Sequence, residues 1–122
     1  MDARTINSGL SVSPQITVDD VATVRDHGFR AIICNRPDGE GMDQPNFEEI
    51  ETAARALGLE ARYLPIVAGK VQDEDAETFG ALIEELPGPV LAYCRTGTRS
   101  ATLWSLAAAG QKPVADILDA TQ

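Results

Sequence analysis

The residues best suited to chemistry lie in one short stretch, Cys94-Arg95-Thr96-Gly97-Thr98-Arg99-Ser100. This stretch follows an apolar run at 90–93 and precedes an apolar-periodic run at 101–109, which is typical of a tight turn between a buried strand and a helix. Such a turn points several backbone N–H groups inward and adds the positive end of a helix dipole. The sequence therefore predicts a small anion-binding cup with a thiol at its rim.

Cys94 is the predicted nucleophile of this cup. A free cysteine has a pKa of about 8.5, and helix N-termini and neighbouring arginines lower that value, which favours the reactive thiolate. Arg99 falls in the first turn of the predicted helix, where its charge opposes the helix dipole unless an anion is bound. We therefore expect Cys94 and Arg99 to be catalytic. The residues expected to bind the substrate are Arg95, Thr96, Gly97, Thr98 and Ser100.

Individual roles within the loop differ. Backbone amides from Arg95 to Arg99 are expected to stabilise a bound anion, and Ser100 to cap the following helix and support the loop. The Arg95 side chain either steers an anionic substrate or points to solvent, and the sequence leaves both readings open.

Three further residues are expected near the cup. Arg36 and Asp38 either line the pocket or brace a Gly-rich turn through an ion pair. Cys34 ends a strand that is expected to neighbour the strand before Cys94. It is either a small core residue or a partner that forms a reversible disulfide with an oxidised Cys94.

The elements that position these residues can be placed from apolar periodicity and capping signals. Helices are predicted to begin with capping residues at Thr17, Asn46 and Asp73 and, for the last helix, at about Ser100, and to end at Gly28, Gly58, Pro87 and Gly110. Strands are predicted over 10–16, at an edge, and over 29–34, 60–67 and 90–93. A last apolar-periodic segment begins at Pro113.

Alternating strands and helices predict an α/β fold with a mainly parallel sheet of four to five strands flanked by helices. In such sheets ligands bind at the carboxyl ends of the strands. The loops at 35–45, 68–72 and 94–100 all leave strands at that edge, so we expect them to surround one site.

Composition limits the function. The 122 residues fit one domain, 1–122, and 43% of them are hydrophobic and 24% charged. The formal net charge of −9 argues against a nucleic-acid or membrane partner. Without an apolar span or a signal-peptide pattern, the expected compartment is the cytoplasm. One histidine, His27, and two cysteines provide no cluster for a metal, so neither a metal nor another cofactor is expected.

Four segments together resemble the phosphatase-like domain of the beta-lactamase hydrolase-like family, also known as DUF442. They are the strand entry at 28–34, Asn35-Arg36-Pro37-Asp38-Gly39-Glu40, Leu64-Pro65-Ile66-Val67 and the Cys94 loop. The resemblance implies a fold similar to cysteine-dependent, dual-specificity phosphatases. It also implies that such domains occur alone or joined to persulfide dioxygenase or sulfide:quinone oxidoreductase domains. The sequence leaves open whether the chain is complete or was excised from a longer fusion polypeptide.

Two reactions compete for the cup. The active-site loop of cysteine phosphatases has five residues between the cysteine and the arginine. Here only four residues lie between Cys94 and Arg99, which matches the loop of rhodaneses. A smaller cup suits one sulfane sulfur better than a phosphoryl group. The place where dual-specificity phosphatases carry an acid corresponds to Ala68, Gly69 and Lys70, none of which can supply the proton that an ester leaving group needs.

The sequence therefore favours a sulfurtransferase over a phosphatase. Cys94 would take sulfur from a small anionic donor, such as thiosulfate or a persulfide, and pass it to a thiol acceptor such as glutathione. The alternatives are a phosphatase that acts on phosphotyrosine or small phosphate esters, and a non-catalytic module that binds anions or persulfides.

Overall fold

The computed structural model describes residues 2–111 and shows a five-stranded sheet between two pairs of helices. The sheet order is β1-β2-β5-β3-β4. Its strands are β1 (Arg4–Asn7), β2 (Leu10–Ser13), β3 (Ala31–Cys34), β4 (Glu60–Tyr63) and β5 (Val90–Tyr93). All neighbouring pairs are parallel except β1 and β2, which are antiparallel. The predicted α/β class with a mainly parallel sheet is confirmed.

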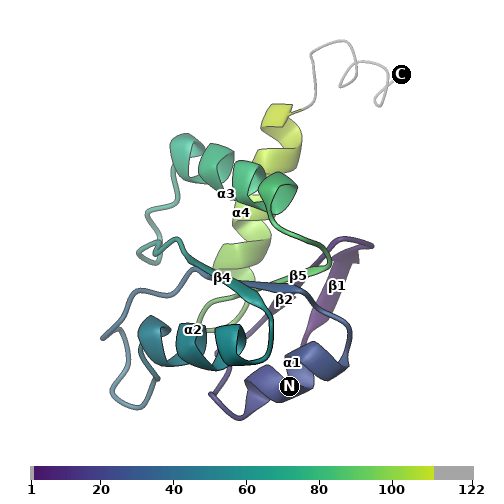
Figure 1. Cartoon of the computed structure of the whole chain (residues 1–122). Helices are drawn as coiled ribbons and strands as arrows, with labels where there is room; N and C mark the ends of the chain where they lie inside the picture. The colour runs from purple at the N-terminus through teal and green to yellow at the C-terminus, as the bar shows by residue number, and fades with distance from the viewer. Residues whose placement is uncertain (1, 112–122) are drawn as a thin grey trace.

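Each face of the sheet is covered by two helices (Figure 1). Helices α1 (Asp20–Asp26) and α2 (Phe47–Ala56) pack on one face, in a cluster with Ile32 and Leu91. Helices α3 (Asp73–Glu85) and α4 (Thr98–Gln111) pack on the other face, in a cluster with Ile33 and Ala92. Successive strand residues point to opposite faces of the sheet, and both faces are covered by helices. The strands β3 and β5 are therefore apolar and buried along their whole length.

Two of the predicted capping pairs form the expected hydrogen bonds, although the helix predicted from Thr17 begins only at Asp20, after the capping residue Asp19. The Thr17 hydroxyl accepts the Asp20 N–H at 3.2 Å and the Asp20 carboxylate accepts the Thr17 N–H at 2.8 Å. The Glu49 carboxylate accepts the Asn46 N–H at 3.2 Å. These contacts satisfy N–H groups that have no partner inside a helix.

Two other helix starts differ from the prediction. Asp73 is the first residue of α3 rather than its cap, since the capping residue is Gln72, whose N–H is accepted by Asp75 at 3.0 Å. Helix α4 begins at Thr98 rather than at Ser100. The segment predicted from Pro113 lies outside the described residues.

Two strand predictions are also corrected. The first apolar strand, β2, is internal, because the polar and exposed β1 pairs with it and forms the edge. Strand β4 ends at Tyr63 rather than at Val67. Beyond it the chain still follows β3, since the N–H groups of Leu64 and Ile66 donate to the carbonyls of Cys34 and Asn35 at 2.9 and 3.0 Å.

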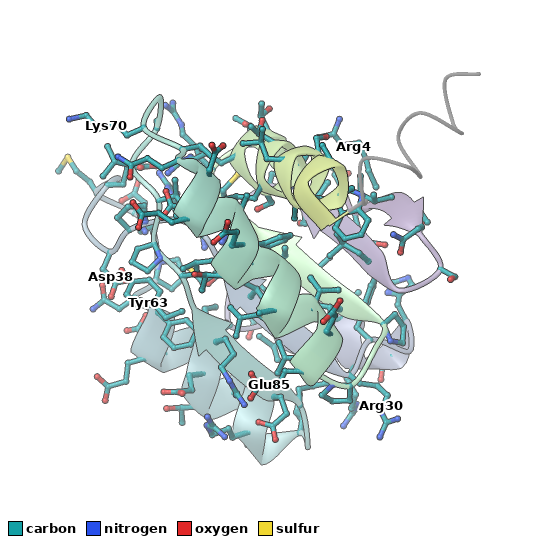
Figure 2. All side chains as sticks on the ribbon, turned by 90° about the horizontal axis from the view of Figure 1, so that it is seen from above. Arg4, Arg30, Asp38, Tyr63, Lys70 and Glu85 are labelled. Atoms are coloured by element: carbon teal, nitrogen blue, oxygen red, sulfur yellow. The ribbon has the colours of Figure 1, made fainter. Side chains whose placement is uncertain are left out.

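The carboxyl ends of the parallel strands meet at one end of the molecule. Figure 2 shows Asp38, Tyr63 and Lys70 at this end and Arg30, which precedes β3, at the other. The three loops that follow β3, β4 and β5 therefore lie together, as the sequence predicts.

Candidate active site

The cup begins where β5 ends. The Cys94 N–H donates to the Ser13 carbonyl at 3.3 Å, and the Cys94 Sγ accepts the Gly97 N–H at 3.1 Å. Gly97 has a φ of 89°, and a Cβ there would lie 3.4 Å from the Ser13 carbonyl group. The glycine thus allows the chain to turn tightly over the thiol. As a result, Cys94 is fully buried.

Arg99 lies in the first turn of α4 and is held from two sides. Its Nη1 and Nη2 donate to the two carboxylate oxygens of Glu40 at 2.8 and 2.6 Å, and Nη1 also donates to the Ile66 carbonyl at 2.8 Å. Hydrogen bonding to Glu40 raises the pKa of Arg99. One guanidinium therefore connects the loops that follow β3 and β4 to the Cys94 loop.

Glu40 is a site residue that sequence reasoning did not select. Its carboxylate also accepts the Arg36 Nε at 3.0 Å, and the Arg36 Nη1 donates to the Gln15 side chain at 3.1 Å. The hydrogen bond from Arg99, with that from Arg36, lowers the pKa of Glu40 despite partial burial. The spacing of Glu40 four residues after Arg36 in the same loop was the signal available in the sequence.

A cavity of about 850 Å³ opens above these residues. Its walls come from the loop after β3, the loop after β4 and the Cys94 loop. The lining residues are Arg36, Glu40, Gly41, Val67, Ala68, Gly69, Val71, Arg95, Thr96, Thr98, Arg99 and Thr102. Cys94 does not line the cavity, because it lies beneath the loop.

The remaining residues of the Cys94 loop divide into exposed and buried groups. Arg95, Thr96 and Thr98 are exposed at the cavity, and the two threonine hydroxyls lie 3.1 Å apart. Ser100 is fully buried, and its hydroxyl donates to the Asn35 side chain at 2.8 Å. Ser100 thus ties the start of α4 to the end of β3 instead of facing a substrate.

Arg36 and Asp38 have different positions. Arg36 is buried and lines the cavity. Asp38 is not among the cavity-lining residues: its carboxylate accepts the Phe47 N–H at 2.8 Å, and its own N–H donates to the Tyr63 hydroxyl at 2.9 Å. Asp38 therefore braces the loop against α2 and β4, because these two contacts take it away from the pocket.

The wall formed by the loop after β4 carries no carboxylate. Ala68 and Gly69 line the cavity, whereas Lys70 follows them in a turn closed by its N–H to the Val67 carbonyl at 3.0 Å. Among the lining residues that the structure describes, Glu40 is the only carboxylate.

Cys34 is a buried thiol at the end of β3, and its Sγ donates to the Arg36 carbonyl at 3.2 Å. It pairs in register with Tyr93, and both side chains belong to the cluster under α1 and α2. Cys94 follows Tyr93 in the turn after β5, and no disulfide joins the two buried thiols. Burial raises the pKa of Cys34 to about 11. This arrangement favours a core role for Cys34 over a disulfide with Cys94.

The family model for the phosphatase-like domain of beta-lactamase hydrolase-like proteins matches residues 2–111. The chain belongs to this family. A beta-lactamase hydrolase-like protein from Agrobacterium fabrum (strain C58) is 35% identical over 106 residues, which are 87% of this chain. Those residues are 25% of the relative, so the chain spans about a quarter of its length.

Solved structures show the same fold. A protein of Neisseria meningitidis Z2491, described as a candidate phosphatase, is 41% identical with a TM-score of 0.81, over 93% of this chain and 81% of the other. The core catalytic domain of a PP-IP phosphatase from S. cerevisiae shares the fold at 10% identity and a TM-score of 0.66, over 83% and 60% of the two chains. The family member described here thus has the fold of cysteine-dependent phosphatases, and this points to an enzyme with a cysteine nucleophile.

The residues that the structure describes contain neither a membrane-spanning helix nor a cluster of metal-binding side chains. Within residues 2–111 no helix is long and apolar enough to cross a membrane. Over the same residues, no group of three or more histidine, cysteine, aspartate or glutamate side chains is placed to hold a metal ion.

Proposed function

We propose that the chain uses Cys94 as a nucleophile and that the group it transfers is sulfur. The Cys94 thiolate attacks the outer sulfur of thiosulfate or of a persulfide, and the S–S bond of the donor breaks with release of sulfite or a thiolate. The sulfur remains as a Cys94 persulfide. Glutathione, another thiol or cyanide then attacks the outer sulfur and restores the Cys94 thiolate.

One observation carries this proposal: the cavity has no group ready to donate a proton to a leaving group. Its one described carboxylate, Glu40, is hydrogen-bonded to Arg36 and Arg99, and its pKa is lowered. Cleavage of a phosphate ester expels an alkoxide or phenoxide, which requires a general acid. Sulfite and thiolates leave without one, so sulfur transfer suits this cavity.

The size of the cup agrees with sulfur transfer. Four residues separate Cys94 from Arg99, and Cys94 is fully buried beneath them. A two-coordinate sulfur atom is narrower than a phosphoryl group with three equatorial oxygens. The loop therefore has to open less for a sulfane sulfur to reach the Cys94 thiol than for a phosphoryl group to reach it.

A phosphatase is the second candidate, and the comparisons favour it over sulfur transfer. The family description is phosphatase-like, and the structural neighbours include proteins described as phosphatases. A shared fold does not by itself fix the reaction, because function depends on the site. The third candidate is a module that binds anions or persulfides without turnover.

The proposed partners come from the resemblance to the family, whose domains occur joined to enzymes of persulfide chemistry. A persulfide dioxygenase or a sulfide:quinone oxidoreductase, fused or separate, would consume or supply the persulfide. These partners and a cytoplasmic location remain proposals.

A side-by-side assay tests the three candidates. The chain is treated with thiosulfate and then with cyanide, and separately with an aryl phosphate. Sulfur transfer predicts one added sulfur on Cys94 by mass spectrometry and thiocyanate formation, both lost in Cys94→Ser and retained in Cys34→Ser. Aryl phosphate turnover that requires Cys94, without sulfur addition, would replace the proposal by a phosphatase. Sulfate or sulfite binding without either turnover would support the non-catalytic module.

A further inference from the structure

The Glu40 carboxylate occupies the guanidinium face that would otherwise bind an anion. Both terminal nitrogens of Arg99 donate to it, in the paired geometry that carboxylates and other oxyanions share. Only 10% of the Arg99 side chain and 24% of the Glu40 side chain are exposed. An oxyanion that binds Arg99 in this way must therefore displace Glu40 or lie beside it.

The protein holds Glu40 in this place. Arg36 donates to the same carboxylate and is itself fixed by Gln15. At Gly41 an added Cβ would lie 2.6 Å from the Arg36 Nη2, so the glycine allows the arginine to pack against the loop. The ion pair between Glu40 and Arg99 thus belongs to a packed cluster and is not a chance contact of two surface side chains.

The balance of charge in the cavity follows from this cluster. Its charged lining residues are Arg36, Arg95, Arg99 and Glu40. Glu40 offsets one of the three arginines, and Arg36 and Arg99 both direct N–H groups at it. A donor with two negative charges meets about twice the electrostatic repulsion from Glu40 that a donor with one charge meets, and it competes more strongly for the N–H groups of Arg36 and Arg99.

The geometry points to Glu40 as the residue that makes the site select sulfur donors by charge, in favour of singly charged persulfides and thiosulfonates over dianions such as thiosulfate. The inference rests on the proposed sulfur transfer and names its donor class. With methanethiosulfonate as donor, the Cys94 thiolate forms an S–S bond to the outer sulfur. The S–S bond of the donor breaks, and methanesulfinate leaves with the electron pair and the negative charge.

Methanethiosulfonate and thiosulfate form a matched pair of donors for the test. Both deliver one sulfur atom, and they differ by one charge at the leaving group. The experiment measures kcat/KM for thiocyanate formation with each donor, in the full chain and in Glu40→Gln. The control is Glu85→Gln, an equal change of net charge at an exposed residue at the far end of α3 from Asp73.

We expect Glu40→Gln to raise kcat/KM for thiosulfate roughly tenfold or more, and to change that for methanethiosulfonate less than about threefold. Glu85→Gln should change neither. An unchanged ratio between the two donors in Glu40→Gln overturns the inference. Glu40→Ala is a second variant that removes the same charge without placing a glutamine side chain in the cavity. A similar change of the donor ratio in both variants assigns the effect to the charge.

A binding measurement separates failure of this inference from failure of the proposed function. Sulfate and methanesulfonate differ by the same one charge, and their binding to the full chain is measured by isothermal titration calorimetry, which requires no sulfur transfer. If Glu40→Gln strengthens binding of sulfate roughly tenfold but binding of methanesulfonate less than about threefold, selection by charge holds even if no sulfur is transferred. If binding of the two anions changes equally, or does not change, the inference fails, whether or not the chain transfers sulfur.

Discussion

Replacing Asn35 should destabilise the protein strongly, because its fully buried side chain joins two segments at the site. Its Nδ2 donates to the Leu64 carbonyl at 3.0 Å, and its Oδ1 accepts the Ser100 hydroxyl at 2.8 Å. Asn35→Ala leaves the buried Ser100 hydroxyl unpaired, at a cost of about 1–3 kcal/mol, and removes the partly buried bond to Leu64, worth about 0.5–1.5 kcal/mol. We expect the free energy of unfolding to fall by about 2–4 kcal/mol.

A double-mutant cycle assigns this loss to the hydrogen bond. Ser100→Ala alone should cost about 1–2 kcal/mol, and the double variant should be more stable than the sum of the two single changes predicts, by about 1 kcal/mol. Urea unfolding followed by the fluorescence of Trp104, which packs partly buried in α4, measures all four proteins. Ser105→Ala, at an exposed position of the same helix, is the matched control and should change stability by less than about 0.5 kcal/mol. Costs that simply add would refute the proposed link between β3 and α4.

Three further outcomes are expected. Because the pKa of Glu40 is lowered by Arg99, its contribution to stability is present above the ordinary carboxyl range and is lost as the pH falls through the lowered value. Urea unfolding from pH 7 to 3 should therefore show a steeper acid loss in the native chain than in Glu40→Gln, and equal slopes would contradict this pairing. Because the pKa of Cys34 is about 11, iodoacetamide at pH 8 should not alkylate Cys34 in the folded protein, and peptide mapping that finds it modified would show that the site opens. Gly97→Ala should lower stability more than Gly28→Ala, by roughly 1 kcal/mol, since both have positive φ but only the former meets neighbouring atoms; equal losses in thermal unfolding would remove the steric argument.

The sequence predicted the parts of the fold that rest on local patterns. The apolar runs of β3 and β5 and the pairs Thr17–Asp20 and Asn46–Glu49 each depend on residues within a few positions of one another. It missed β1, because this strand is exposed along its whole length, contains a single apolar residue, Ile6, and is fixed by pairing with β2. It extended β4 too far, because the apolar residues after Tyr63 continue the pattern and the N–H groups of Leu64 and Ile66 still donate to the chain of β3 beyond the strand.

The sequence identified the Cys94 loop as the candidate site but did not identify Glu40, which contacts this loop from the loop after β3. The Cys94 loop is contiguous in sequence, so its residues could be identified together. Glu40 meets Arg99 across 59 positions, and no local spacing indicates such a contact. Asp38 was a reasonable pocket residue by position, but local hydrogen bonding to the start of α2 determines where its carboxylate lies.

The attachment of Arg99 to both Glu40 and the Ile66 carbonyl gives the site a way to report its own occupancy. A ligand that takes over the Arg99 N–H groups facing Glu40 removes the link from α4 to the loop after β3, in which Met42 is fully exposed. Binding close to a buried thiol would thus become visible on the outer surface, as faster hydrogen exchange of the backbone at 38–43. A neighbouring domain could distinguish the loaded from the empty state by contacting that loop, without reaching the sulfur itself.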